Sequence, residues 1–181
     1  MTALAGVSVY SSSRPCNRAH TGLVLVQMNF LIPLLVCLFW LPVNAASLVV
    51  GDALPPIAAK DQFGKDFTFT TNVQFLLVAT NMNCAKEANH KLAEQSPGFL
   101  EEHHAAYLMD VHTMPAVARW FAFPKLRKYP HRIVLIDSAE TLAAVPSQTN
   151  CVTLLAITPA WRIKKISYWN PVSEPVTGIF Q

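Results

Sequence analysis

A short apolar run followed directly by a helical pattern that begins at a cysteine constrains this chain most. Residues 73–79 are apolar and rich in β-branched and aromatic side chains, which is typical of a buried strand. Polar residues 80–83 end the run, and Cys84 opens a pattern in which apolar residues recur on one helical face. Asn83 is of a type that caps helix N-termini. We therefore expect a buried strand, a turn, and a helix that places a thiol at its start.

The front of the chain has the pattern of an export signal. Arg14 and Arg18 precede residues 21–51, which contain no charged residue, and residues 23–41 are almost all apolar. Residues 43–45, Val-Asn-Ala, resemble the small-residue site at which such signals are cleaved.

These features predict a signal peptide over residues 1–45, with Met28 as a possible true start, and a globular domain over residues 46–181. An uncleaved membrane anchor is the alternative, since about 20 apolar residues span a bilayer. In both cases we expect the globular part outside the cytoplasm, in the periplasm or secreted. Cys16 and Cys37 belong to the leader, so the domain contains two cysteines in an oxidising compartment.

Charge narrows the class of partner. Residues 1–45 hold two of the 14 basic residues and none of the 11 acidic ones, so the rest of the chain has a formal net charge of +1. This balance gives no sign of nucleic acid or of an acidic substrate as a partner. Trp161 and Trp169 flank the last predicted strand and suggest a surface for a protein partner in the cell envelope. We expect membrane contact only through the N-terminal segment, if that segment is retained.

Strand and helix patterns alternate along the rest of the chain. The predicted strands cover residues 57–59, 66–70, 105–109, 132–136, 151–157 and 162–168. The predicted helical segments cover residues 84–103, with an interruption at Pro97, 113–124 and 139–145. Strands separated by helices indicate parallel βαβ units, and the last two strands indicate an antiparallel hairpin with a possible bulge.

Particular residues predict three further details of these elements. Gly64 lies where a turn requires a positive φ, so residues 57–70 form a hairpin at the edge of a sheet. Trp120 and Phe121 are interpreted as core residues on the apolar face of a helix that Thr113 caps. Residues 125–128 form a basic turn that we expect to be solvated, with contact to an anionic membrane surface as the alternative.

Three short motifs, in this order of elements, resemble the redoxin branch of the thioredoxin-like superfamily. They are Val-Gly-Asp-x-x-Pro at 50–55, Asp-Gln-x-Gly-Lys at 61–65, and the strand, turn and cysteine at 75–84. A strand led by Pro130 and ended by Asp137 is similar to the YtfJ-like group of exported proteins. The resemblance covers residues 48–169.

The resemblance implies an α/β, thioredoxin-like fold with a central mixed five-stranded sheet (βαβαβ plus a C-terminal β-hairpin), an N-terminal β-hairpin and flanking helices. Residues 114–125 also resemble, loosely, a stretch of short exported sequences that carry a flavin-dehydrogenase label. Nothing in the chain resembles a flavin site, and we expect no cofactor.

The chain departs from the chemistry of that superfamily. It has no C-x-x-C motif, because Cys84 has no second cysteine at that spacing. Neither the proline nor the threonine that precedes a peroxiredoxin's reactive cysteine stands in register before Cys84. Asn150 and Cys151 occupy the place of the family's cis-proline. If the alignment with the family shifts by one strand, Pro130 takes that place instead. The usual final helix is missing, so one face of the sheet is expected to be thinly covered.

These departures predict a degenerate, non-enzymatic or partner-binding member of the redoxin or YtfJ-like group. One alternative is a thiol-disulfide oxidoreductase or peroxidase that uses Cys84 with Cys151, with His112 as a possible base. A thiol at a helix N-terminus has a physical route to reactivity, because the helix dipole stabilises a thiolate. The resemblance implies that Cys84 and Cys151 are neighbours. A second alternative is a protein that handles a soft metal such as copper, with Cys84, Cys151 and His112 as weak candidate ligands.

Overall fold

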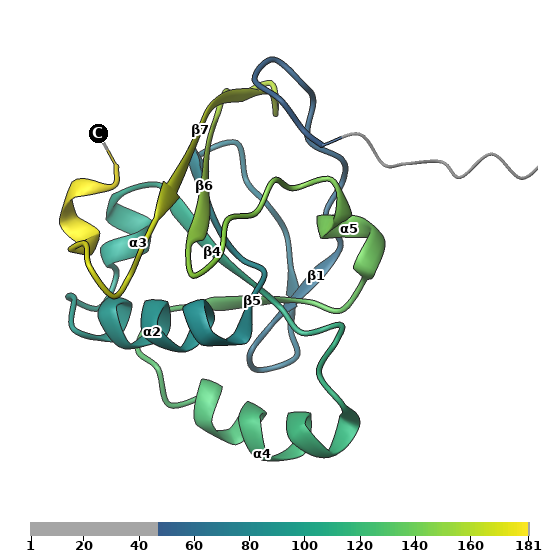
Figure 1. The fold of residues 1–181 in the computed structure, drawn as a ribbon, viewed down its shortest axis with the longest axis vertical. Helices are drawn as coiled ribbons and strands as arrows, with labels where there is room; N and C mark the ends of the chain where they lie inside the picture. The colour runs from purple at the N-terminus through teal and green to yellow at the C-terminus, as the bar shows by residue number, and fades with distance from the viewer. Residues whose placement is uncertain (1–46, 181) are drawn as a thin grey trace, which may run out of the picture. The chain divides into compact units, whose positions relative to one another are not determined.

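The computed structural model describes residues 47–180, and its centre is a seven-stranded mixed sheet in the order β2-β1-β5-β4-β3-β6-β7 (Figure 1). The strands are β1 (Ala59–Asp61), β2 (Asp66–Phe67), β3 (Phe75–Ala79), β4 (Ala105–Asp110), β5 (Ile133–Ile136), β6 (Val152–Ile157) and β7 (Ile163–Trp169). The helices are α2 (Met82–Ala93), α3 (Phe99–Glu102), α4 (Ala116–Leu126), α5 (Ala139–Ala143) and the 3-10 helix η1 (Val176–Gly178).

The central five strands confirm the predicted α/β, thioredoxin-like class. β3, β4 and β5 run parallel, β6 runs antiparallel to β3, and β7 runs antiparallel to β6 with a register shift between Ala156 and Ile157. The predicted N-terminal hairpin is present, and Gly64 in its turn has a φ of 83°. The strand count differs from the five expected, because β1 pairs with the free edge of β5 and joins the hairpin to the same sheet.

The pairing of β6 decides whether Asn150–Cys151 or Pro130 precedes the strand that takes the place of the family's cis-proline strand. β6, and not β5, lies antiparallel to β3, with Val78 opposite Thr153. Asn150 and Cys151 therefore precede the strand that pairs with β3. The alternative in which Pro130 leads that strand is wrong, since β5 pairs with β4 and β1.

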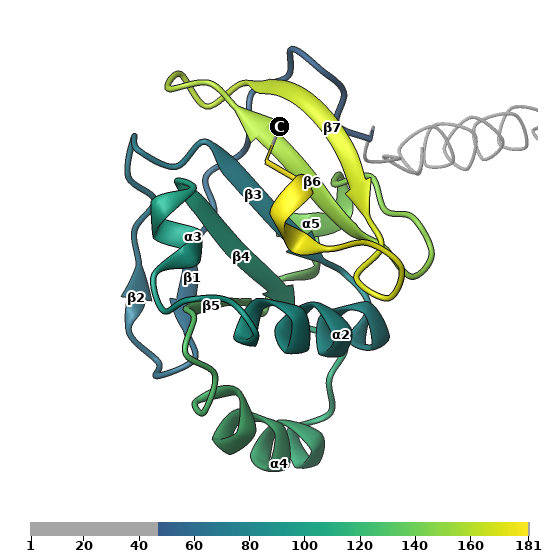
Figure 2. The same ribbon diagram turned by 90° about the vertical axis from the view of Figure 1, so that its left-hand side faces the viewer.

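Two apolar cores cover the two faces of the sheet. Figure 2 shows α2, α3 and the C-terminal segment together on one side of the strands. Alternation along β3 sends Leu77 and Ala79 to the core under α2, α3, α4 and the C-terminal segment. Leu76 and Val78 face the opposite core, which α5 and the N-terminal lead-in close. A buried leucine stabilises such a core by about 1.5–3 kcal/mol relative to an exposed one.

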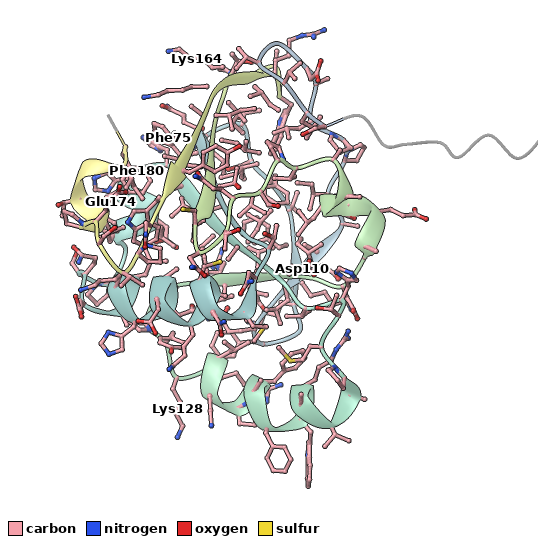
Figure 3. The ribbon with its side chains drawn as sticks, viewed as in Figure 1. Phe75, Asp110, Lys128, Lys164, Glu174 and Phe180 are labelled. Carbon is pink, nitrogen blue, oxygen red and sulfur yellow. The ribbon has the colours of Figure 1, made fainter. Side chains whose placement is uncertain are left out.

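The C-terminal segment covers the face that was expected to be thin. Trp169 is 1% exposed, and its Nε1 donates to the Glu174 carbonyl oxygen at 3.1 Å. The Phe180 ring lies 5.4 Å from that of Phe75 and stacks on that of His103 at 4.6 Å. Phe75 and Phe180 are labelled beside the C-terminal segment in Figure 3. The prediction that Trp169 contributes to a partner surface is therefore wrong, because the returning tail buries its ring.

Asn81, and not Asn83, caps α2. Asn81 has an extended backbone, and its side-chain oxygen accepts from the Asn83 N–H at 2.8 Å. Cys84 is consequently the third residue of the helix and not its first. The predicted interruption near Pro97 is confirmed, because the helical segment divides into α2 and α3.

α4 turns a different face to the core from the one predicted. Ala122, Phe123 and Leu126 pack inward, whereas Val117, Trp120 and Phe121 are 70%, 76% and 61% exposed. Both sets recur at helical spacing, so the periodicity alone could not tell the inward stripe from the outward one. The interpretation of Trp120 and Phe121 as core residues is wrong.

Arg119 fixes the rotation of α4. Its guanidinium donates to both carboxylate oxygens of Asp137 at 2.6 Å and to the carbonyl oxygens of Val111 and Met114 at 2.8 Å. The Asp137 hydrogen bonds raise the pKa of Arg119, and the same contacts lower the pKa of Asp137. Pro115 occupies the N-cap position without a side-chain hydrogen bond, so the prediction of Thr113 as the cap is wrong.

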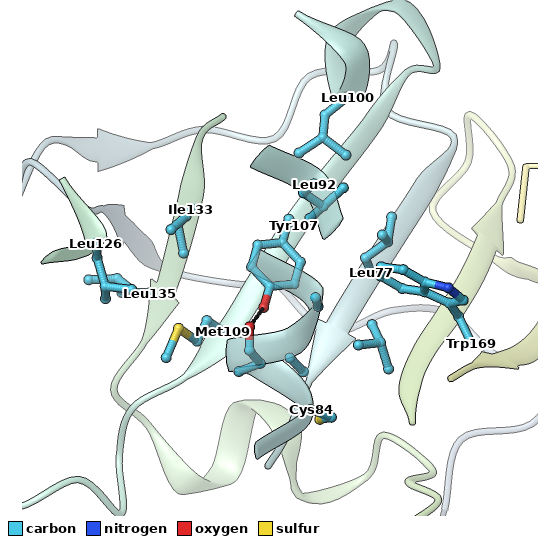
Figure 4. Packing of buried hydrophobic residues seen from close by; sticks show 14 of the residues in the cluster. Leu77, Cys84, Leu92, Leu100, Tyr107, Met109, Leu126, Ile133, Leu135 and Trp169 are labelled. Atoms are coloured by element: carbon cyan, nitrogen blue, oxygen red, sulfur yellow. Dashed lines mark hydrogen bonds between the residues drawn. The ribbon is translucent and has the colours of Figure 1, made fainter. Parts of the chain in front are cut away.

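A buried polar network joins α2 to β4 and to the segment before β5. The Asn89 amide donates to the Ala85 carbonyl oxygen at 2.8 Å, and its own oxygen lies 3.0 Å from His131 Nε2. The Tyr107 hydroxyl also donates to Ala85 (Figure 4). Because the Asn89 oxygen can only accept, His131 carries its proton on Nε2, and Nδ1 is buried without a partner among residues 47–180.

No helix within residues 47–180 is long and apolar enough to cross a membrane. The predicted signal peptide or anchor at residues 1–45 lies outside the described residues.

We expect stability to fall in mild acid because of His131. Burial lowers its pKa from 6.5 to about 4, so between these values the unfolded chain binds more protons than the folded one. The free energy of unfolding therefore has its full value above pH 6.5, and it falls by up to about 3 kcal/mol as the pH drops toward 4. Urea unfolding at a series of pH values measures this slope. His131→Phe should flatten the slope, and His90→Gln, at an exposed position, should leave it unchanged. A full slope in His131→Phe would contradict the assignment of the acid sensitivity to His131.

Candidate functional site

The candidate site lies at the carboxyl ends of β3 and β4, where open α/β sheets place their ligands. Three segments meet there: residues 80–81 between β3 and α2, residues 150–151 before β6, and residues 110–112 after β4. Cys151 and His112 lie in the second and third of these segments, and Cys84 lies in the first turn of α2, directly after the first segment.

Cys84 is buried at 2% exposure, at the edge of the core cluster in Figure 4. Its Sγ donates to the Asn81 carbonyl oxygen at 3.0 Å. Burial raises the pKa of the Cys84 thiol, and this effect outweighs the lowering by the backbone hydrogen bonds at the start of α2. Lys86 does not offset it, because its ammonium lies 3.9 Å from Glu87 and its side chain is 81% exposed. The site therefore favours the thiol over the nucleophilic thiolate.

Cys151 directly precedes β6, the strand that pairs with β3. If the register of Val78 and Thr153 continues by one residue, Ala79 lies opposite Val152, so Cys151 lies beside the turn into α2. A smaller electrostatic influence of Cys151 also raises the pKa of Cys84. Both cysteines are free thiols, and Cys151 is partly exposed. The preceding Asn150 has a φ of 59°, a conformation that asparagine adopts more readily than most residues.

His112 is held by Asp110 and not by a thiol. Its Nδ1 lies 2.6 Å from the Asp110 carboxylate, which also accepts from the His112 backbone N–H at 2.9 Å (Asp110 is labelled in Figure 3). Its carbonyl oxygen accepts from Arg119 at 3.2 Å. Within residues 47–180 no hydrogen bond joins His112 to Cys84 or Cys151, so the role of base stays a prediction.

The three candidate ligands do not form a metal site. In the described part of the chain, no group of three or more His, Cys, Asp or Glu side chains gathers where it could hold a metal ion. The set of Cys84, Cys151 and His112 is therefore not brought together as a ligand cluster.

Two residues of this region were missed by the sequence reasoning. Asn81 both caps α2 and accepts the hydrogen of the Cys84 thiol. Arg119 ties the segment after β4 to the end of β5. A polar residue just before a helix could have indicated Asn81, whereas a single arginine within an apolar helix gives no sign of which carbonyl oxygens it reaches.

A separate cleft of about 560 Å³ lies between α4, β1 and β5. Its apolar lining comes from Val111, Phe123 and Leu135, with Lys60 and Arg127 among its charged residues. Neither cysteine lines this cleft, so it is distinct from the thiol site.

Comparisons with known proteins give a fold-level likeness only. No family model matches the chain, and no curated protein matches it. Among solved structures, it is similar to the thioredoxin domain of a thiol-disulfide oxidoreductase from Bacteroides vulgatus, with 13% identity, a TM-score of 0.48, and coverage of 70% of this chain and 94% of that one.

Two further solved structures are similar at the same level. A peroxiredoxin-like protein from Aquifex aeolicus has 11% identity and a TM-score of 0.47, over 73% of this chain and 82% of that one. A thiol:disulfide interchange protein from Bacteroides sp. has 15% identity and a TM-score of 0.46, over 68% of this chain and 84% of that one.

We expect Cys84 to resist alkylation in the folded, reduced protein. Its low exposure and raised pKa both slow the reaction, whereas Cys151 is partly exposed. Iodoacetamide at pH 7, with site-resolved mass spectrometry, should show Cys151 reacting faster than Cys84. The urea-unfolded chain supplies the reference rate for each cysteine. Alkylation of folded Cys84 at or above its unfolded rate contradicts the assignment.

Proposed function

We propose that residues 46–181 form an exported thioredoxin-fold domain, related to the redoxin and YtfJ-like groups, that binds a partner and does not turn over thiol substrates. The observation that carries this proposal is the state of Cys84. A nucleophilic cysteine needs an accessible thiolate. Cys84 is instead buried, donates its hydrogen to a backbone carbonyl oxygen, and has a raised pKa.

The surroundings of Cys84 support the same conclusion. The sequence offers no C-x-x-C partner, and no general base contacts either thiol within residues 47–180. The Asp110–His112 pair is bonded to itself and to Arg119. These groups join the ends of β4 and β5 and orient α4. At this sheet edge the polar residues therefore stabilise the fold.

Export is proposed on the sequence alone. The uncharged stretch from residue 21 to residue 51, with small residues at 43–45, supports passage across a membrane. The domain would then work in an oxidising compartment, either released or held by its N-terminal segment.

Activity assays on the full chain test the proposal. We expect the wild type to reduce neither a disulfide substrate in the presence of dithiothreitol nor hydrogen peroxide above the rate of the dithiothreitol control. Cys84→Ser should therefore leave both rates unchanged, and Cys151→Ser serves as the matched control. A wild-type rate above the control that Cys84→Ser abolishes overturns the proposal and favours the thiol enzyme.

A second candidate function, a reversible Cys84–Cys151 disulfide, is favoured by the pairing of β6 with β3, because the register brings the segment that carries Cys151 beside the turn into α2. Its formation removes two protons and two electrons, which an added oxidant such as diamide accepts. Because the bridge closes a loop spanning 67 positions, we expect it to raise the free energy of unfolding by about 4 kcal/mol.

Mass spectrometry of the diamide-treated protein and urea unfolding with and without reductant test this second candidate. Cys151→Ser should remove both the bridge and the stability difference. A treated chain that stays reduced at both positions, or that bridges without gaining stability, contradicts it.

A further inference from the structure

The outward face of α4 is an apolar surface that no element within residues 47–180 covers. Val117, Trp120 and Phe121 recur on it at helical spacing and are 70%, 76% and 61% exposed. The rings of Trp120 and Phe121 lie 5.2 Å apart, so they form one aromatic patch. A helix that is apolar on both sides is normally buried on both sides. This exposed stripe therefore indicates a surface that meets something outside the described domain.

Positive charge borders the aromatic patch. Trp120, Phe121, Pro124, Lys125 and Lys128 line one open hollow of about 450 Å³. Both lysines are exposed, and neither forms an ion pair within the described residues. An occupant of this hollow would meet aromatic rings and two ammonium groups together.

Further basic residues follow the C-terminal end of α4 in the chain. Between Asp110 and Asp137 the sequence has five arginines and lysines and no acidic residue. Arg119 is neutralised by Asp137, but Lys125, Arg127, Lys128 and Arg132 form no ion pair among residues 47–180. A second copy of this chain docked face to face would bring the same lysines together, so self-association through this face is disfavoured. The complementary partner is anionic.

We propose that the outward face of α4 docks the domain on an anionic lipid bilayer. The proposal rests on the proposed function, and it names the partner as a membrane surface. A helix that presents Trp and Phe beside lysines matches the composition of segments that lie in the membrane interface, where rings enter the acyl boundary and ammonium groups meet lipid phosphates. The apolar run at residues 23–41 would bring the domain to such a surface during export or as an anchor.

The docking requires no change in the fold. Arg119 holds α4 from the inner side through Asp137 and the Val111 carbonyl oxygen, so the helix already presents the aromatic patch outward. In Figure 3, Lys128 lies at the α4 end of the domain and Lys164 at the opposite end. The proposed face is thus confined to one end of the molecule, and the other end supplies a control.

Site-specific fluorescence tests the proposal on the full chain. Val117→Cys and Val172→Cys place an environment-sensitive fluorophore at positions of matched exposure, 70% and 71%. Cys16, Cys37 and Cys151 are replaced by serine in both. The probes are phosphatidylcholine vesicles with and without phosphatidylglycerol. Any contribution of residues 1–46 is common to the two label positions, so it cannot produce a difference between them.

We expect a blue shift of the label at position 117 with phosphatidylglycerol vesicles and no shift at position 172. The double reversal Lys125→Glu, Lys128→Glu should abolish the shift, because each basic residue near an anionic leaflet contributes about fivefold to the partition coefficient. Lys164→Glu, Lys165→Glu, at two exposed positions of β7, changes the net charge equally and should preserve most of it. Trp120→Ala should weaken it without altering the pH dependence of unfolding.

Three results would overturn the proposal: equal shifts at the two label positions, a shift that ignores phosphatidylglycerol, or insensitivity to the charge reversal at residues 125 and 128. A shift at position 117 with an acidic peptide but not with vesicles also overturns it and assigns the face to a protein. The thiol assays report on the proposed function separately. If the protein shows no redox turnover and the label at position 117 does not respond to vesicles, the lipid partner is rejected and the non-enzymatic function stands. If redox turnover depends on Cys84, the non-enzymatic function is rejected.

Discussion

The packing of the first turn of α2 against β3 and β6 determines what the thiol site can do. That packing places Cys84 in the same core as Leu77, Ala79 and Val152, so the sulfur contributes to the core as a small apolar group. The N–H groups and dipole of a helix N-terminus favour a thiolate. They act here on a sulfur without solvent, and burial has the larger effect on its pKa. The start of a helix can make a cysteine reactive, but at this helix start burial keeps the Cys84 thiol protonated.

The same sheet edge is held together by Arg119. The arginine bonds to Asp137 after β5 and to carbonyl oxygens of the segment after β4, which places α4 across the ends of two parallel strands. Hydrogen bonds to a charged group are roughly twice as strong as hydrogen bonds between neutral groups. Arg119 is therefore the residue that selects which apolar stripe of α4 is buried. If Arg119 faced outward, the aromatic stripe would pack on the sheet and the basic turn would be displaced.

The sequence was sufficient where local pattern and tertiary structure agree. The strand from residue 73, the glycine turn at Gly64 and the break near Pro97 each depend on interactions within a few residues, and the structure confirms them. It was insufficient where distant segments decide. Trp169 is buried by a tail that folds back over it, and the orientation of Trp120 depends on Asp137, which is 17 positions away. At the candidate site, the order of elements predicted that the segments bearing Cys84, Cys151 and His112 lie at one sheet edge, but local pattern could not show that Cys84 would be buried.

Net charge is a weak guide to the partners of this domain, because it averages over surfaces that do not act together. A formal charge of +1 for residues 46–181 gives no hint of an anionic partner. Yet Lys125 and Lys128 line the hollow beside Trp120 and Phe121, and no acidic residue among residues 47–180 lines it. Screening limits the reach of exposed charges to about 8–10 Å at physiological salt, so a surface interacts through its local charge. The face of α4 therefore acts as a basic and aromatic surface on a nearly neutral domain, and that local combination is what favours a lipid partner over a soluble neutral one.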